Sequence, residues 1–176
     1  PVIVNVSLYL DHFGPYDETK SEFSMALQVH FNWFDERLAA NSSEINDSAN
    51  FNTAAIQMLN IWRPSIYFSN PNMPSAGLLS EKSSGQIMGR IMASGRVHLV
   101  KRTTMTGSCK VNIKLYPVDV QQCSIQLESS INDNQLSLQW AKLPGSKDLV
   151  FSDDFKLGNF ELIDHNLFGQ RVSYQN

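Results

Sequence analysis

The stretch Cys109-Lys-Val-Asn-Ile-Lys-Leu-Tyr-Pro-Val-Asp-Val-Gln-Gln-Cys123 decides the fold, because it is bounded by the only two cysteines of the chain. Its centre, Tyr116-Pro117-Val118-Asp119, is placed to turn. Apolar residues alternate with other residues before this centre, at Val111, Ile113 and Leu115, and again after the second cysteine, at Ile125 and Leu127. The pattern predicts two strands joined by a loop. The cysteine spacing favours a disulfide, and a ring of this size would stabilise the fold by about 3 kcal/mol. The alternative is two unpaired thiols, buried as small apolar residues.

Composition favours a single all-β domain. A length of 176 residues with 42% apolar residues is enough for one well-buried core and short for two. Gly, Pro, Asn and Ser recur between short alternating runs, which is typical of a β-sandwich. The net charge of −3 offers no basic surface for nucleic acid or anionic lipid. No apolar run reaches the roughly 18 residues of a membrane helix, so no segment of this sequence is predicted to span a membrane.

Three Asn-x-Ser sequons predict glycosylation and an extracellular, oxidising setting. Asn41 and Asn46 fall in a polar stretch that is predicted to be a surface loop. Asn5 lies instead in a run with the two-residue period of a strand.

Alternation along the chain predicts the individual strands. The clearest run is 23–33, where every odd-numbered residue is apolar. Strands are also predicted for 2–10, 96–105 and 136–140, and the alternation in 155–174 predicts more. Turns or loops are predicted for 11–20, which contains Gly14-Pro15, and for 71–85 and 144–154.

Three motifs resemble those of the pentameric Cys-loop ligand-gated ion channels. The loop between the cysteines has the family's aromatic-Pro-x-Asp centre, and Trp33-Phe-Asp35-Glu-Arg37-Leu38 resembles a segment of its anion-selective branch, gated by glycine, gamma-aminobutyrate or glutamate. The alternative for this second motif is a surface ion pair of little energetic value. The stretch 61–68 is similar to the family's Trp-x-Pro-Asp segment, although Ser65 stands where relatives usually have Asp.

This resemblance covers essentially the whole chain and implies both a fold and a function. The fold is an immunoglobulin-like twisted β-sandwich of about ten strands, with Cys109 joined to Cys123. Residues 1–176 correspond to an extracellular ligand-binding domain, without the family's N-terminal helix, ligand-closing loop, last strand and transmembrane domain. The implied partners are identical or homologous subunits in a pentamer and a small-molecule ligand, with no nucleic acid and no cofactor. The membrane contact would be made through the missing transmembrane domain, on the extracellular side of the plasma membrane.

The resemblance also implies where a ligand binds, between two neighbouring subunits. The expected residues are Tyr67, Glu128 and Ser130 on the principal side, and Gln28, His30, His98 and Val100 on the complementary side. Relatives hold amines in a box of aromatic rings, and here Ser130 and Gln28 replace two of those aromatics. Relatives clamp a carboxylate with Arg where this chain has His30, and an imidazole is a poorer clamp than a guanidinium. We therefore expect an orphan subunit or one with an unusual ligand.

His30 and His98 are expected on neighbouring strands. Because histidine titrates near neutral pH and binds zinc, our hypothesis is that the pair makes the interface sensitive to protons or zinc. The alternative is two half-exposed polar residues without a special role.

Coupling to the pore is expected at the membrane end. The resemblance assigns it to the first hairpin turn and the tip of the cysteine loop, namely Phe13, Gly14, Pro15, Tyr16, Tyr116, Pro117 and Asp119. The alternative for the loop tip is an ordinary turn with an exposed aromatic.

Two further function classes compete with this one. An enzyme is not predicted, because no catalytic or phosphate-binding motif occurs and the four histidines lack the spacing of a metal site. A soluble pentameric binding protein of the acetylcholine-binding-protein type is the alternative to a channel. The Tyr-Pro-Val-Asp centre of the loop favours the channel, because a soluble homologue has no membrane domain for it to contact.

Overall fold

The computed structural model describes residues 1–39, 48–51, 61–70, 77–80, 85–110, 112–115, 119–131, 134–141, 149–153, 155, 157 and 160–169, with the backbone alone for 48–51 and 113. The described part contains ten strands and two short 3-10 helices. In chain order these are β1 (Val2–Asp17), β2 (Glu22–Phe34), η1 (Glu36–Leu38), β3 (Ser48–Phe51), β4 (Ile66–Phe68), β5 (Ile87–Met92), β6 (Arg96–Lys110), η2 (Ile113–Leu115), β7 (Gln122–Cys123), β8 (Leu127–Ser129), β9 (Leu136–Trp140) and β10 (Val150–Phe151).

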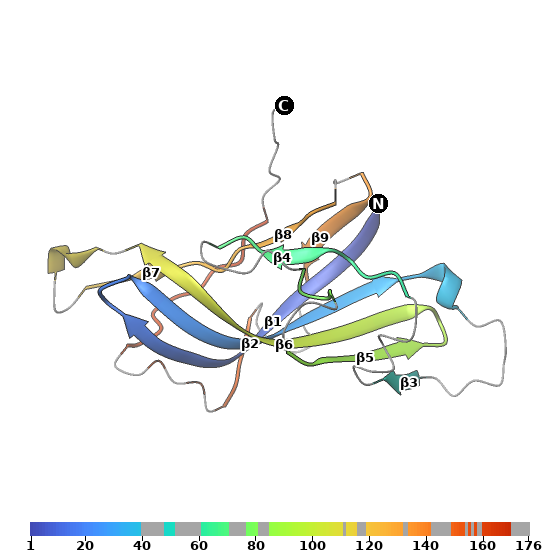
Figure 1. The fold of residues 1–176 in the computed structure, drawn as a ribbon, viewed down its shortest axis with the longest axis horizontal. Coiled ribbons are helices and arrows are strands. Elements are labelled where there is room, and N and C mark those ends of the chain that lie inside the picture. Colours follow the sequence, from blue (N-terminus) through green and yellow to red (C-terminus); the bar gives the residue numbers. More distant parts are fainter. Residues whose placement is uncertain are drawn as a thin grey trace.

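The strands form two layers (Figure 1). The larger sheet has the order β10-β1-β2-β6-β5-β3, with β9 also paired to β1 and β7 to β6. The second layer is the antiparallel pair β4-β8. The predicted all-β sandwich is confirmed.

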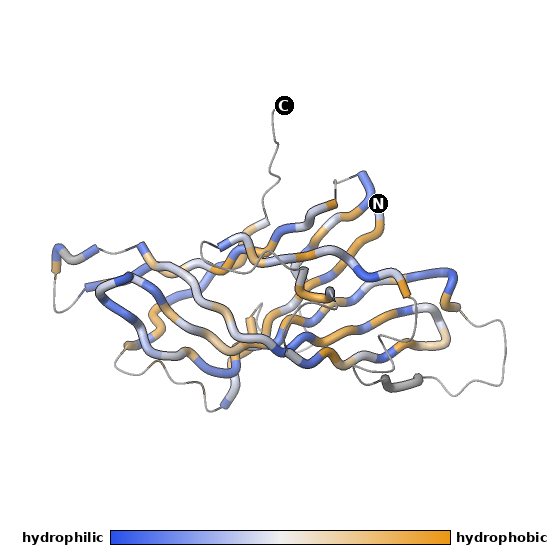
Figure 2. Tube along the Cα trace, in the orientation of Figure 1, coloured by the Kyte–Doolittle hydropathy of each residue, from blue (hydrophilic) through white to orange (hydrophobic). Residues whose placement is uncertain are grey.

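The core lies on one face of the long strands β2 and β6. The odd-numbered residues of β2 from Phe23 to Trp33 are all buried, while the even-numbered ones lie on the other face, as the alternation predicts. The alternating polar and apolar positions along these strands can be followed in Figure 2. From the second layer, Ile66 and Phe68 of β4 join the same core cluster. One face of β2 and β6 is therefore left for contacts outside the core.

The first hairpin differs from its prediction. The stretch 11–20 was expected to turn at Gly14-Pro15, but β1 continues to Asp17 and the turn lies at 18–21. Irregularities in the β1–β2 register between Leu10 and His12 and between Phe13 and Tyr16 accommodate the proline, which cannot donate to a ladder. Asp17 closes the actual turn by accepting hydrogen bonds from the backbone N–H groups of Thr19 and Lys20.

Two other strand predictions are wrong. Ile113–Leu115 forms the 3-10 helix η2 instead of continuing the strand before the loop centre. The alternation in 155–174 gives no strand among its described residues, which are 155, 157 and 160–169. Alternation marks an apolar face, but a strand also needs a neighbour to pair with.

The tryptophan motifs at 33 and 62 meet in space. The indole rings of Trp33 and Trp62 lie edge to face with centroids 6.0 Å apart.

Just after Trp33, the Arg37 guanidinium donates two hydrogen bonds to the Asp35 carboxylate, at 2.9 and 2.7 Å. These bonds hold the pKa of Asp35 below its ordinary value.

Gly107 is a packing position in the core. It lies opposite Phe23 in the β2–β6 register, and a Cβ at residue 107 would come within 2.5 Å of the Phe23 ring. We expect Gly107→Ala to lower the free energy of unfolding by about 1–3 kcal/mol, measured by urea denaturation, because the buried ring would have to shift. Gly169→Ala is the matched control, since no atom of the described residues lies within 4 Å of its Cβ position. An unchanged midpoint for Gly107→Ala would contradict this packing.

Candidate functional site

The loop between the cysteines is closed by a disulfide. Cys109 and Cys123 are bonded and face each other in the β6–β7 register, which confirms the pairing. Leu115 and Val120 within the loop are exposed by 71% and 63%. Asp119 accepts a hydrogen bond from the Gln121 side chain. The predicted tip residues Tyr116 and Pro117 lie outside the described residues.

The first hairpin turn lies beside this disulfide. Both are at one end of the molecule, on the left in Figure 1. The backbone N–H of Cys109 donates to the carbonyl of Ser21 in the turn, at 3.0 Å. The first hairpin turn and the cysteine loop are therefore joined by a backbone hydrogen bond.

The predicted coupling residues of the first hairpin lie further into the sheet than expected. Phe13, Gly14, Pro15 and Tyr16 are in β1, where Phe13 stacks on Phe23 with ring centroids 5.3 Å apart and Tyr16 packs edge to face against Phe160. The residues next to the disulfide are 18–21, which the sequence reasoning missed. The signal for them was Asp17 followed by Thr19, a pattern that closes an Asx turn.

The predicted complementary residues gather on the outer face of the large sheet. His30 of β2 faces Val100 of β6 in the register, and the same pairing places Gln28 opposite Arg102. The Nδ1 atom of His30 lies 3.2 Å from Nε2 of His98, and the two imidazole rings are stacked with centroids 5.4 Å apart. The structure therefore brings His30 and His98 into direct contact.

Burial disfavours the charged form of both imidazoles. Desolvation is the main cause that lowers the pKa of His30, with a further contribution from the nearby His98, whereas Asp11 acts in the opposite direction. Desolvation also lowers the pKa of His98, and the charge of Arg90 adds to this effect. Gln28 donates to the Asp11 carboxylate at 2.9 Å and so holds that anion beside the pair.

Two arginines flank this face, and no site role was predicted for either. Arg90 of β5 lies opposite His98, and Arg102 of β6 lies opposite Gln28. Both are exposed. They add positive charge to the face on which His30 replaces the arginine that clamps a carboxylate in relatives. Only the pairing of β5 with β6 reveals Arg90 as part of this face.

The predicted principal residues meet on the small sheet. Tyr67 of β4 lies opposite Glu128 of β8, and its hydroxyl donates to Glu128 Oε2 at 3.2 Å. Ser130 donates to the Ser65 hydroxyl at 2.6 Å, and the backbone N–H of Ser130 donates to the Ser65 carbonyl at 3.1 Å. The unusual Ser65 therefore contacts the unusual Ser130.

A buried asparagine fixes the end of β4, and the sequence reasoning did not single it out. Asn70 is 6% exposed; its Nδ2 donates to the Ser124 carbonyl at 2.7 Å, and its Oδ1 accepts from the Gln126 backbone at 2.8 Å. These two bonds set the position of the chain that leads into Glu128.

The two sets of residues lie on opposite outer surfaces of the sandwich. His30 and His98 are on the face of the large sheet that points away from the core, whereas Tyr67 lies between the core residues Ile66 and Phe68 and so points outward from the other layer. A single chain does not bring the two sets together.

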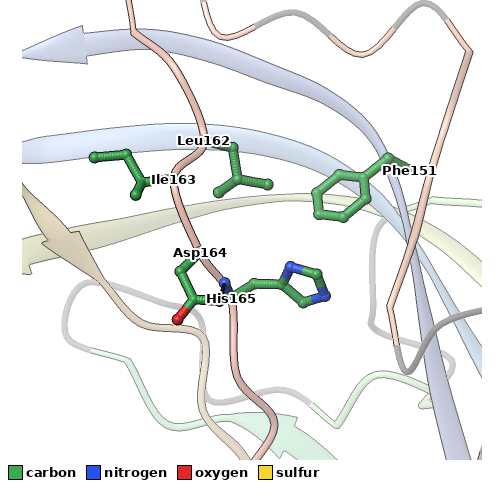
Figure 3. A pocket seen from close by; sticks show the side chains of 5 residues that line it. All are labelled: Phe151, Leu162, Ile163, Asp164 and His165. Atoms are coloured by element: carbon green, nitrogen blue, oxygen red, sulfur yellow. Dashed lines mark hydrogen bonds between the residues drawn. The ribbon is translucent and has the colours of Figure 1, made fainter.

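A shallow hollow of about 400 Å³ lies away from all of these residues. It is lined by Phe151, Leu162, Ile163, Asp164 and His165. Figure 3 shows the rings of Phe151 and His165 close together beside Leu162; their centroids are 5.5 Å apart. The Asp164 carboxylate accepts from the His165 backbone and from Asn166. None of the predicted site residues lines this hollow.

The three predicted glycosylation sites stay predictions. Asn5 is half-buried in β1 and lies between Asn32 of β2 and Gln139 of β9. Asn41 and Asn46 lie outside the described residues.

The described ranges carry neither a metal cluster nor a membrane helix. Within them, no group of three or more His, Cys, Asp or Glu side chains is arranged around a common centre. Among those same residues, no helix has the length and apolar character needed to cross a bilayer.

Comparison with known proteins gives a consistent result. Residues 1–173 match the family model of the neurotransmitter-gated ion-channel ligand binding domain. Over 165 residues the chain is 29% identical to gamma-aminobutyric acid receptor subunit rho-3 of Homo sapiens, covering 93% of this chain and 34% of that protein. It is also 29% identical over 158 residues to subunit rho-2 of Mus musculus, covering 89% of this chain and 32% of the relative. The chain thus spans about a third of the length of these curated relatives.

Proposed function

Because the chain belongs to the neurotransmitter-gated ion-channel ligand-binding domain family, we propose that residues 1–176 form the extracellular ligand-binding domain of a pentameric ligand-gated channel subunit in the plasma membrane. Ligand binding between subunits gates the flow of ions. The anion-branch motif at 33–38 and the likeness to gamma-aminobutyric acid receptor subunits support chloride as the permeant ion.

The observation that carries this proposal is the placement of the two residue sets on opposite outer faces. In a ring of like subunits, the Tyr67 and Glu128 side of one subunit faces the His30 and His98 side of the next. Each half-site is then completed by a neighbour. This arrangement explains why polar residues from distant parts of the sequence gather on two separate surfaces.

The chemistry of the principal half-site favours a ligand with an amino group. A carboxylate at Glu128, hydrogen-bonded to the phenol of Tyr67, attracts a cationic amine by charge, and the aromatic ring adds a cation–π contribution. The opposite half-site presents the two imidazoles of His30 and His98, with Arg90 and Arg102 at its edge. A carboxylate on the same ligand would reach a guanidinium only at that edge. We therefore expect weak responses to gamma-aminobutyrate and stronger ones to an amine of different shape.

Coupling is proposed at the end that carries the disulfide. The turn at 18–21 and the cysteine loop are hydrogen-bonded there through Ser21 and Cys109, and the exposed Leu115 and Val120 offer an apolar surface. In the full-length subunit these segments would contact the transmembrane domain. Tyr116, Pro117 and Asp119 belong to the same proposed contact.

The test is to express the full-length subunit in cells and to record current against a panel of amine transmitters. In Glu128→Gln we expect the half-maximal concentration of the most effective amine to rise about tenfold or more, because an ionic hydrogen bond to the ligand is lost. Glu36→Gln, on the exposed η1, is the matched control. An unshifted response of Glu128→Gln would overturn the assignment of the principal half-site. Current with no agonist dependence would overturn ligand gating itself.

A further inference from the structure

We propose that the hydroxyl groups of Ser65 and Ser130 select, at the principal half-site, an amine that also carries a neutral hydroxyl group. The two serines lie next to Tyr67 and Glu128 on the small sheet formed by β4 and β8 (Figure 1). Relatives usually carry Asp and an aromatic residue at these two positions, so the serine pair is a feature of this chain. The assignment names the class of ligand for the same site and rests on the proposed function.

The serine pair and the Tyr67–Glu128 pair form successive rows on the outward side of the small sheet. Ile66 is fully buried in the core, and alternate residues of a strand share a face, so Ser65 and Tyr67 point outward. Tyr67 lies opposite Glu128 in the register. In the next row, the Ser130 backbone N–H donates to the Ser65 carbonyl at 3.1 Å. The rows are about 7 Å apart, because they are separated by two residues of a strand.

The serine pair keeps hydrogen-bonding capacity for a ligand. The Ser130 hydroxyl donates to the Ser65 hydroxyl at 2.6 Å, which uses one of the two hydroxyl hydrogens. Among the described residues the second hydrogen has no acceptor, and lone pairs remain on the oxygens. Ser130 is exposed and Ser65 is half-buried, so a ligand can reach the pair. The pair can therefore donate one hydrogen bond and accept another.

The neighbouring carboxylate decides which chemical group the serine pair takes. An ammonium group is attracted to Glu128, whose Oε2 atom accepts from Tyr67 at 3.2 Å. A ligand carboxylate on the serine pair would lie about 7 Å from that anion and would be repelled by it. A hydroxyl group carries no charge and both donates and accepts, as the serine pair does. The selected ligand thus has an amine at one end, a hydroxyl at the other, and a spacer of about the length of an aromatic ring.

Backbone contacts hold Ser65 in place from two sides. On one side it is bonded to Ser130, and on the other the backbone N–H of Leu78 donates to the carbonyl of the adjacent Ile66 at 2.7 Å. The Cβ position of Gly77 lies 3.7 Å from Ser65 Oγ, so the segment before Leu78 packs against the serine. Hydroxyl groups that are already fixed lose little conformational freedom when a ligand binds, which favours selection by this pair.

The experiment compares two probes that differ only in a hydroxyl group, tyramine and 2-phenylethylamine. Each is titrated by calorimetry into the purified full-length protein. We expect the wild type to bind tyramine about threefold to tenfold more tightly, because the probe's hydroxyl gains hydrogen bonds from the serine pair. In the double variant Ser65→Ala/Ser130→Ala the two affinities should become equal. Ser129→Ala is the matched control and should keep the wild-type preference, because Ser129 lies opposite the buried Ile66 on the other side of the sheet.

The possible results separate the serine assignment from the proposed function. Circular dichroism first establishes that each variant is folded. Equal affinities in the wild type, a preference that persists in the double variant, or binding of neither probe would each overturn the serine assignment. Glu128→Gln should weaken the binding of both probes by a similar factor and leave the preference for tyramine intact. A tyramine preference without any evoked current would leave the serine assignment standing and contradict ligand gating, whereas currents evoked equally by both probes would do the reverse.

Discussion

Replacing Cys109 and Cys123 together by serine is expected to lower the free energy of unfolding by about 3 kcal/mol. The bond closes a loop with a sequence separation of 14, so its loss increases the conformational entropy of the unfolded chain. The bond also holds β7, which is two residues long and, among the described strands, pairs only with the end of β6. Urea denaturation of the wild type and the double variant measures the difference.

The single variant Cys109→Ser serves as a comparison for this prediction. It should lose about as much stability as the double variant, because either substitution opens the same loop. A double variant with an unchanged midpoint would show that the hydrogen bond between Cys109 and Ser21, together with the β2–β6 ladder, is sufficient to hold this end. In the full-length subunit, the same substitution should reduce agonist-evoked current more than agonist binding.

Replacing Lys101 by alanine is expected to cost about 3 kcal/mol of folding free energy. This lysine lies on the core side of β6, is 0% exposed, and is flanked in the register by Val29 and Ile87. Its ammonium donates to the Gly85 carbonyl at 3.0 Å. Alanine would leave a cavity beside two apolar residues and remove a donor from a backbone carbonyl.

Lys101→Met separates the two contributions. It keeps the length of the side chain and removes the charge, so it should change the stability by less than about 1.5 kcal/mol. Lys110→Ala, at the exposed end of the same strand, is the control and should have little effect. Equal losses for Lys101→Ala and Lys110→Ala would contradict the buried role of Lys101.

The pH dependence of stability gives an independent check on Lys101. Burial lowers its pKa below the ordinary 10.5, so between the folded and unfolded pKa values the unfolded chain binds more protons. Stability should therefore rise with pH in the window that ends near 10.5, relative to Lys101→Met, which lacks this group. Urea midpoints of both proteins at several alkaline pH values measure the effect. Parallel pH profiles would contradict it.

Lys101 also shows where prediction from the sequence stops. Alternation places β2 and most of β6 correctly, because a two-residue period and burial on one face are linked by strand geometry. The same rule assigns position 101 to the core, yet the residue is charged. Only the fold brings the Gly85 carbonyl to its ammonium, and this contact is not encoded in any local pattern.

The sequence predicted which residues form the candidate site, but it did not predict how they are arranged in space. Family resemblance grouped Tyr67 with Glu128 and His30 with His98, and the structure places each pair in contact. The family resemblance gave no role to Arg90, because the position of this residue beside His98 depends on the pairing of β5 with β6. The predicted position of the first turn was also wrong. Gly14-Pro15 is a strong local turn signal, but in the structure these residues lie within β1, at a register shift between β1 and β2.

The place of β1 in the sheet has a consequence for biosynthesis. One edge of β1 pairs with β2, which follows directly, but its other edge pairs with the late strands β9 and β10, both in parallel. At roughly 5–20 residues per second, about ten seconds pass before β9 leaves the ribosome. Throughout that time the nascent chain carries an open, apolar strand edge that invites pairing with other chains. We therefore expect the yield of folded protein to depend on protection of this edge of β1 until β9 and β10 have been made.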